Sequence, residues 1–445
     1  MVIFFLYAVL TAVAIARPYL IIYLLVIGAP FYEYFTEFFR KICLVNICFT
    51  LKPFLFLTVL LISLSFFKLN LKNRLSFISF ELSHKIAILF LSFFAIIMFY
   101  FSLQSGSGYL TEINMLINMS LIFFIPYFYY KREIKLNLLV RTLTVVVFFV
   151  SAYSLIYFFL RNPVFLRFSK HPGFCSFLLF TFPFLMVDYF LVQGKARTLF
   201  CLVTVFTSFL AILFSLTRSS FIGLLIIVPL FIVFMVKVLS DNSVVLLKIR
   251  LLVSGLVFAV LVSVWFSPMV REAVIFPKAI FIVSDKNVIK DDAANKIENT
   301  YLKNAYLVLA HERTIVWRKS IDLIMSSPFK GYGLNYHVVP GLLGAHNNFV
   351  AILVAGGVIG FVLFIIALVA ILLTLFKKIQ SIFSVSKRLF FFAIFCSLIC
   401  VFIQGLVQTV INEYIIWLVV AFVFLDPGFL VISGKDWEFS DCRRS

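Results

Sequence analysis

Three residues with chemically useful side chains stand at the edges of long apolar runs. Arg218 lies in FSLTRSSFIGLL, Arg313 lies in HERTIVW, and His346 opens the apolar run in AHNNFVAILVAGGVIG. A charge in hydrocarbon costs about 2.5–3.5 kcal/mol at mid-membrane, so arginines this close to it usually have a function. Arginine binds phosphate oxygens through paired hydrogen bonds, and a neutral histidine can accept a proton. These residue types suit a site for an anion and a hydroxyl.

The composition indicates what kind of elements must position these residues. Of the 445 residues, 63% are hydrophobic and only 13% are charged, and the mean hydropathy is +1.13. This predicts an all-α, polytopic membrane protein. The net charge is +19, but the basic residues are scattered between apolar runs. That scatter argues against nucleic acid as a partner and favours membrane topology and contact with membrane lipids.

About twelve apolar runs are candidates for transmembrane helices, each of which needs roughly 20 residues. The first run contains Arg17–Pro18, so it either crosses once as a tilted helix or is broken into a pair. The predicted spans are 3–33, 53–67, 86–103, 113–130, 139–160, 173–192, 197–216, 219–239, 249–267, 347–376, 388–404 and 406–433.

Lysine and arginine in the short loops set the predicted orientation, because such residues accumulate on the cytoplasmic side. The five basic loops are 68–85, 129–135, 193–197, 237–250 and 376–388. With the spans above, all five share one side, and both termini are predicted to be cytoplasmic. Residues Arg40 and Lys41 depart from the rule, since this topology places them outside. The same topology leaves the nearby Cys43 and Cys48 facing an oxidising compartment.

The predicted organisation follows from these spans. Residues 1–267 hold the first nine spans, 268–346 form one long periplasmic loop, 347–433 hold the last three spans, and 434–445 form a cytoplasmic tail. The loop begins polar and then shows a helical pattern from His311 to Met325, which Pro328 and Gly331 end. An amphipathic helix on the membrane surface is predicted there.

The spans that follow Arg218 and His346 run in the same direction, so both helix N-termini point outward. Each helix N-terminus carries about half a positive charge and free N–H groups. With Arg218 and Arg313 they predict a dianion site, beside which His346 stays neutral. Taken singly, each residue also has a simpler interpretation. Arg218 could contact lipid phosphate, Arg313 could pair with Glu312, and His346 could cap its helix.

Glycines in the run after His346 are interpreted as helix-packing positions, namely Gly356, Gly357 and Gly360. The sequence contains no phosphate-binding loop, no nucleophile elbow and no zinc-type spacing, so neither a metal nor a cofactor is expected. An outward-facing site without nucleotide machinery needs a donor that is already activated and already in the membrane. A polyprenyl diphosphate meets both conditions.

The C-terminal half resembles the superfamily of O-antigen ligases and polymerases. The resemblance covers about 215–362 and includes LTRSS, ERTIVWRKSIDLIMSSPFKGYGLNYH and AHNNFVAILVAGGVIG. In the last stretch, His346, Asn347, Gly357 and Gly360 have the spacing of the ligase pattern. The N-terminal half has a suitable arrangement of spans but no comparable motif.

The resemblance implies a metal-independent, inverting glycosyltransferase of the membrane-embedded C-type fold in the bacterial inner membrane. Such enzymes take glycan from undecaprenyl diphosphate at the periplasmic face. Arg218 and Arg313 would neutralise the leaving diphosphate, and His346 would deprotonate or orient the acceptor. The candidate substrate-binding residues besides the two arginines are Asn347, His171, Lys170, Trp317 and Tyr336.

Several functions stay open at this point. In a ligase the acceptor is a sugar hydroxyl of lipid A–core, and in a polymerase it is the terminal sugar of another lipid-linked repeat. The histidine pattern favours the ligase. A protein O-oligosaccharyltransferase and a transporter of lipid-linked glycan are weaker alternatives. A transporter is expected to show charged or broken helices near the membrane midplane and a repeat between its halves.

Overall fold

The computed structural model describes most of the chain after residue 81 and a few residues before it. The described residues are 23, 26–27, 42–44, 47–49, 82–105, 115–116, 118–119, 121–128, 134–159, 172–215, 218–239, 243–266, 316–333, 347–406 and 414–431. At some segment ends, including Arg218, the backbone is described but the side chain is not.

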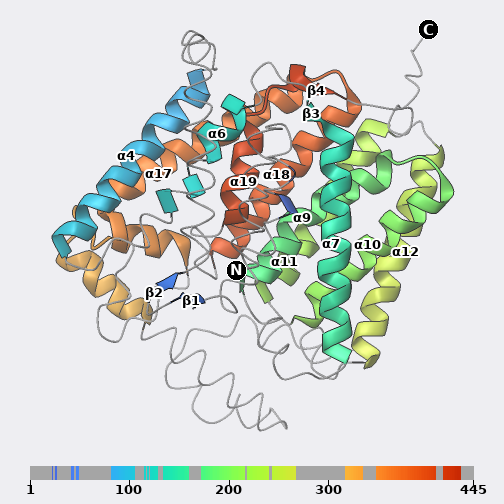
Figure 1. Cartoon of the computed structure of the whole chain (residues 1–445), viewed down its shortest axis with the longest axis horizontal. Coiled ribbons are helices and arrows are strands. Elements are labelled where there is room, and N and C mark those ends of the chain that lie inside the picture. Colours follow the sequence, from blue (N-terminus) through green and yellow to red (C-terminus); the bar gives the residue numbers. More distant parts are fainter. Residues whose placement is uncertain are drawn as a thin grey trace.

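The described elements are almost all helical (Figure 1). In chain order they are β1 (Ile42–Leu44), β2 (Ile47–Phe49), α4 (Leu82–Ser105), α6 (Leu121–Phe128), β3 (Ile134–Lys135), α7 (Leu136–Phe159), α9 (Pro172–Leu191), α10 (Lys195–Phe214), α11 (Arg218–Leu239), α12 (Ser243–Phe266), α17 (Asn348–Ser381), α18 (Val385–Gly405), α19 (Tyr414–Val423), η4 (Pro427–Phe429) and β4 (Leu430–Val431). A further helical segment covers 316–326.

In the described part of the chain, eight helices are long and apolar enough to cross a membrane. They are α4, α7, α9, α10, α11, α12, α17 and α18. Each coincides with a predicted span, which confirms a multi-pass, all-α membrane protein. The predicted spans 113–130 and 406–433 contain the shorter helices α6 and α19. The predicted spans 3–33 and 53–67 lie almost wholly outside the described residues, so the total of twelve stays a prediction.

Helix α9 lies at the centre of the bundle (Figure 1) and packs against α7, α10, α11, α18 and α19. Its window Phe174–Leu191 is buried on every side. A helix that is apolar all round is one that other helices surround. The outer helices instead expose large apolar side chains, such as Phe149 on α7, Val233 on α11 and Phe258 on α12. These exposed faces are suited to lipid.

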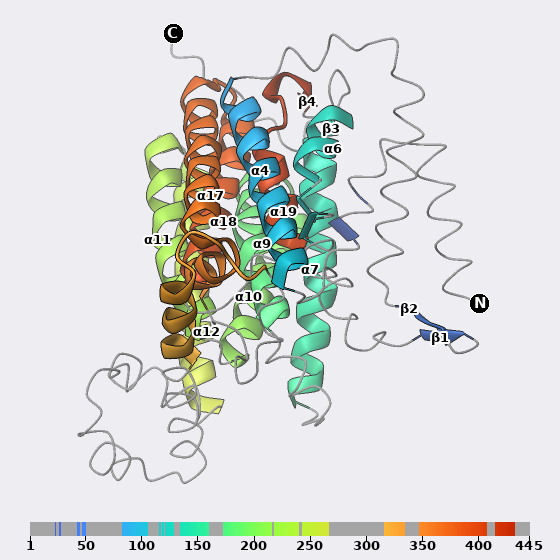
Figure 2. The same ribbon diagram turned by 90° about the vertical axis from the view of Figure 1, so that its left-hand side faces the viewer.

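The bundle has two ends, which we name from the elements that meet there. At the loop end, lower in Figure 2, α12 finishes while α11 and α17 begin. The name refers to the predicted loop 268–346, which separates α12 from α17 in the sequence. At the opposite cap end, α9, α17 and α19 finish. Helix α17 runs along α4, as both views show, and its second neighbour is α18.

Several helices extend beyond the predicted spans at the cap end, and the basic residues there explain why. Helix α12 begins at Ser243, before the predicted 249, and α17 continues to Ser381, past the predicted 376. The extra turns carry Lys248 and Lys378, which the sequence had placed in loops. Both lysines fold back onto carbonyl groups of neighbouring helices. A lysine whose ammonium group donates to carbonyl oxygens can therefore extend a membrane helix beyond its apolar run.

Four cations at the cap end bind carbonyl oxygens of helix ends or of the turns just beyond them. Lys248 Nζ donates to Tyr189, Phe190 and Val192 at the end of α9, over 2.7–3.1 Å. Lys378 Nζ donates to Val423 and Leu425 after α19, both at 2.7 Å. Lys387 Nζ donates to Pro427 at 2.7 Å, and the Arg388 guanidinium donates to Ile382 after α17.

The strands form two small pairs. Strands β1 and β2 are antiparallel, with Ile42 opposite Phe49, Cys43 opposite Cys48 and Leu44 opposite Ile47. Strands β3 and β4 pair in parallel and join the start of α7 to the end of the described chain.

Candidate functional site at the loop end

Helix α17 is broken at Gly357, about two and a half turns after it begins. Gly357 has φ 59° and ψ −167°, a backbone conformation outside the helical region. Only glycine adopts a positive φ of this kind without strain. The break removes the helical bond between the Val354 carbonyl and the Val358 amide. Both groups therefore need partners from elsewhere, since an unpaired backbone group in a membrane is costly.

A strap formed by residues 328–333 supplies those partners. The Tyr332 amide donates to the Val354 carbonyl at 2.9 Å, and the Gly333 amide donates to the Ala355 carbonyl at 2.9 Å. In the other direction, the Val358 amide donates to the Pro328 carbonyl at 2.8 Å. The strap thus replaces the helical bonds that the break removes. It also ties the segment before α17 to the helix itself.

The strap fits only because glycines lie at its contacts. A Cβ on Gly331 would overlap the Ala355 carbonyl, and one on Gly333 would overlap Ser102 of α4. A Cβ on Gly357 would lie 2.6 Å from the Phe329 carbonyl oxygen. The prediction of simple helix packing is therefore right for Gly360, which faces Phe94 and Met98, but incomplete for Gly357, where the helix breaks.

Asn347 joins the start of α17 to the end of α18. Its side-chain oxygen accepts hydrogen bonds from the amides of Phe349 and Val350, at 2.8 and 3.1 Å. This is the usual way to cap a helix N-terminus. Its Nδ2 donates to the Leu406 carbonyl at 3.0 Å. One residue further on, Asn348 packs so closely that a Cβ on Gly405 would lie 2.6 Å from its Nδ2.

Gln404 makes the matching connection between α18 and the start of α11. Its Nε2 donates to Ser220 Oγ at 2.9 Å, and both side chains are fully buried. The Gln404 Oε1 and Ser219 Oγ are also buried, and neither has a hydrogen-bond partner among the described residues. Buried polar groups are normally satisfied. These two oxygens belong to, or lie next to, the two residues of this hydrogen bond at the start of α11.

The N-terminal ends of α11 and α17 therefore both contact the C-terminal end of α18. Neither α11 nor α17 has an acidic residue in its first turn. Each N-terminus carries about half a positive charge and the α18 C-terminus about half a negative one. The C-terminus of α10 also lies next to the start of α11 in the chain, so helix ends of both signs meet here.

Part of the chain that forms this site is similar to a known protein family. Residues 203–365 match the family described as O-antigen ligase. These residues, 163 of the 445 in the chain, are similar to that family. The match spans α11, α12, the strap and the broken part of α17, while the residues of α4 and the end of α18 that contact them lie outside it. No curated protein matches the chain.

Members of the O-antigen ligase family are glycosyltransferase-like enzymes that act on lipid-linked glycans in membranes. The match therefore supports transfer of glycan of the ligase or polymerase type for this domain. It does not distinguish between the two types.

Most of the predicted site residues lie outside the part of the chain that the structure describes. His346, Arg313, Tyr336, His171 and Lys170 fall on undescribed residues, and Arg218 is described only as the first backbone position of α11. Asn347 and Trp317 are described. Asn347 has the capping role above, and its predicted contact with substrate stays a prediction.

Trp317 and Tyr332 differ in their surroundings. Trp317 lies on the helical segment 316–326 with 43% of its surface exposed. Tyr332 packs against the core from the strap, and its hydroxyl is 2.8 Å from Ser326 Oγ. An exposed aromatic face suits contact with a sugar ring or with lipid, whereas Tyr332 serves mainly to hold the strap.

Sequence reasoning missed Gln404, Ser219 and Ser220. Gln404 stands alone in the apolar run CVFIQGLV, and an amide in such a run is a signal that a polar partner lies nearby. The partner, Ser220, is far away in sequence, so only the fold reveals the pair. Among the described residues, no three acidic, histidine or cysteine side chains gather as metal ligands.

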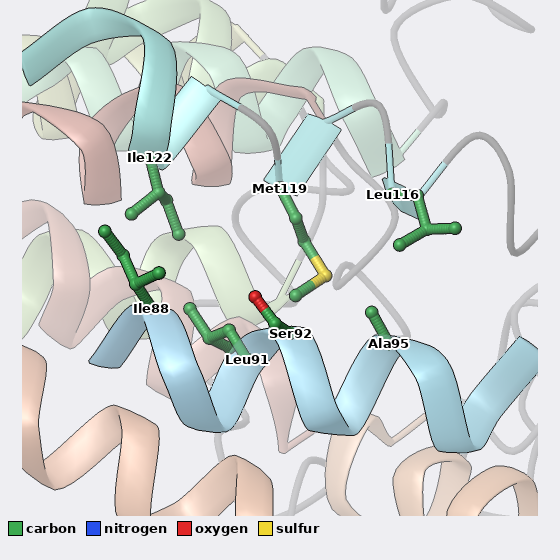
Figure 3. Close-up of a pocket in the computed structure, with 7 residues that line it drawn as sticks. All are labelled: Ile88, Leu91, Ser92, Ala95, Leu116, Met119 and Ile122. Atoms are coloured by element: carbon green, nitrogen blue, oxygen red, sulfur yellow. The ribbon is translucent and has the colours of Figure 1, made fainter. Parts of the chain in front are cut away.

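A separate cavity of about 90 Å³ lies between α4 and the residues that precede and begin α6 (Figure 3). Its lining is apolar apart from Ser92. Ile88, Leu91 and Ala95 come from the same face of α4, and Met119 and Ile122 come from the opposite side. A lining of this kind does not suit a charged diphosphate, so the cavity is not a candidate for the reacting groups.

Proposed function

We propose that the chain is an O-antigen ligase-like glycosyltransferase. It transfers glycan from undecaprenyl diphosphate to a sugar hydroxyl of lipid A–core at the periplasmic face of the inner membrane. The observation that carries the proposal is the meeting of the α11 and α17 starts at the end of α18; both starts lie within the residues that match the O-antigen ligase family. Arg218 begins one of these helices, and His346 immediately precedes the cap of the other.

The proposed chemistry uses this arrangement for a displacement at the anomeric carbon. The acceptor hydroxyl forms a new C–O bond there while the bond to the diphosphate oxygen breaks, so the configuration inverts. His346 takes the hydroxyl proton. Arg218 and Arg313, with the two helix starts, stabilise the charge that develops on the departing diphosphate. Since these groups supply the positive charge, the proposed reaction has no metal step.

The remaining features of the proposal concern the fold and the substrates. The spans would form a C-type glycosyltransferase fold of about twelve helices, with both termini cytoplasmic and the loop end periplasmic. The partners would be the undecaprenyl-diphosphate-linked glycan, the lipid A–core or glycan acceptor, and membrane lipids. Asn347, His171, Lys170, Trp317 and Tyr336 would contact the glycan.

A polymerase that acts on the same donor is the second candidate. The spacing of His346, Asn347, Gly357 and Gly360 favours the ligase, while the acceptor is set by residues that this pattern does not include. Transport of lipid-linked glycan has one feature in its favour, because α17 is broken within its span. The polar groups at the loop end favour transfer instead.

Lipopolysaccharide profiling in a strain that lacks this gene tests the proposal. The glycan on undecaprenyl diphosphate should be analysed in parallel. Long polymer that accumulates on the carrier, with bare lipid A–core, would establish the ligase. Single repeat units on both carrier and core would establish the polymerase. An unchanged profile would refute both functions in that pathway.

A further inference from the structure

The hairpin of β1 and β2 places two of the seven cysteines directly opposite each other. Cys43 and Cys48 are register partners, with one further pair on either side. Directly opposed residues occupy the same face of a two-stranded ribbon. Their Cα atoms are about 4.5–5.5 Å apart in either kind of antiparallel pair. A disulfide spans Cα distances of about 4.4–6.8 Å, so the backbone register is compatible with one.

Four of the other cysteines are described, and they lie on helices instead of opposite one another on paired strands. Among the described residues, Cys175, Cys201, Cys396 and Cys400 form no disulfide and are buried in α9, α10 and α18. Cys396 and Cys400 follow each other by four positions on one helix, and both are surrounded by apolar side chains. Such cysteines behave as small apolar residues. The hairpin cysteines differ in that the backbone register pairs them across two strands.

A hairpin this short also has a physical need for a cross-link. Each strand has three residues, and the described register contains three pairs. A two-stranded hairpin in isolation is at best marginally stable in water. A covalent bond across the central pair limits the conformations of the open chain and so favours the paired state.

We propose that Cys43 and Cys48 form a disulfide across the hairpin, outside the membrane. The location rests on the orientation given under the proposed function, which places 34–52 on the oxidising side. Structural disulfides form and persist in such compartments and are rare in the cytosol. The proposal adds a modification site in the N-terminal part of the chain.

Formation of the bond requires an oxidant, which is a protein disulfide donor of the outer compartment. One cysteine thiolate attacks the donor disulfide, forms a mixed disulfide and releases one donor thiolate. The second cysteine thiolate attacks the mixed disulfide and releases the other donor thiolate. One S–S bond forms in the hairpin and one breaks in the donor. The two cysteines lose two electrons and two protons in total, and the donor gains them.

Thiol labelling of the full-length protein in intact cells tests this proposal. The probe is a membrane-impermeant maleimide, applied with and without an impermeant phosphine reductant. Neither Cys43 nor Cys48 should be labelled before reduction, and both should be labelled after it. The peptide that contains both cysteines should be lighter by two hydrogens before reduction. The variants Cys43→Ser and Cys48→Ser each leave one thiol alone, which should be labelled without reductant.

Cys442 in the C-terminal tail is the control for the opposite side, since it should be labelled only after the cells are permeabilised. Labelling of Cys43 and Cys48 in intact cells without reductant would overturn the disulfide but leave the orientation in place. Labelling of the hairpin cysteines only in permeabilised cells would overturn both. Neither result would depend on which glycan the protein transfers.

Discussion

The two ends of the helix bundle use polar groups in opposite ways. At the cap end, Lys248, Lys378, Lys387 and Arg388 donate to carbonyls at or just beyond helix ends. Cations there neutralise the negative ends of helices and satisfy their last carbonyls. At the loop end, α11 and α17 begin without an acidic residue in the first turn. Neutral side chains connect both of these starts to the end of α18.

The difference shows which charges are available for a ligand. A cation that already binds two or three carbonyls has little capacity left for a substrate phosphate. The starts of α11 and α17 lie beside the C-termini of α18 and α10 but have no acidic side chain in their first turn. The 38 lysine and arginine residues that give the net charge of +19 are therefore not all candidates for anion binding. Cations that donate to carbonyls at the C-terminal ends of helices have a structural role. Cations near helix N-terminal ends are the candidates for substrate binding.

Removal of His346, the proposed base at the loop end, is expected to have the largest effect on transfer. His346→Ala should lower the rate of glycan transfer by about 10²–10⁴-fold, the range typical of general acid–base catalysis. Transfer should be measured with purified protein, lipid-linked glycan and acceptor. His311→Ala is the control from the same predicted loop and should have a much smaller effect. Equal losses in the two variants would argue against a base at His346.

The second effect concerns Arg218 and compares the two ends of a single helix. Arg218→Ala at the start of α11 should lower transfer by about 10²–10³-fold, because a positioned donor no longer stabilises the leaving diphosphate. Lys237→Ala at the other end of α11 should leave transfer close to the wild-type rate, since Lys237 is exposed there. Both proteins should reach the membrane in normal amounts. Near-normal activity of the Arg218 variant would remove its role.

The third effect tests the strap that holds the broken helix. Gly331→Ala introduces a Cβ that overlaps the Ala355 carbonyl, so the strap must move away from α17 and leave its backbone groups unpaired. We expect loss of transfer together with a lower midpoint of thermal unfolding. Gly360→Ala is the matched control, because its Cβ would meet Met98 at an ordinary 3.8 Å. If both variants behaved alike, the strap would not be a specific constraint.

The smallest effect on activity is expected at the cap end. Lys378→Met removes the donor that binds Val423 and Leu425 and should lower stability by about 1–3 kcal/mol, the typical cost of leaving buried polar groups unsatisfied. Transfer per folded molecule should stay unchanged. The exposed neighbour Lys377 is the control, and Lys377→Met should alter neither quantity. Unfolding in detergent measures the stability difference. A loss of activity without a loss of stability would contradict the structural role of Lys378.

Much of the fold could be predicted from the sequence, because apolar length alone identifies membrane helices. The eight described spans were all predicted within a few residues. The errors at their ends have one cause. Lys248 and Lys378 were assigned to loops as charged residues, yet both lie on helices and reach carbonyls of neighbouring chain segments. The carbonyl partners belong to distant segments, so sequence patterns cannot show them.

The candidate site was harder to predict. The predicted span that begins at 347 agrees with the start of α17, but the cap is Asn347, whereas the sequence had suggested capping by His346. The break at Gly357 was not predicted, because a glycine in an apolar helix usually allows close packing. Its cause is the strap, which has to be recognised in three dimensions. The contact of Gln404 with Ser220 was missed for the same reason.

The central claim is that the loop end, and not the cap end, binds the diphosphate of the donor. The most direct test is the affinity of undecaprenyl diphosphate for the purified protein in detergent. Hydrogen bonds to charged groups contribute about 1.5–3 kcal/mol each, so the double variant Arg218→Ala/Arg313→Ala should bind roughly 100-fold more weakly or worse. Lys237→Ala should bind like the wild type. Unchanged affinity in the double variant, or a comparable loss in Lys237→Ala, would contradict the account.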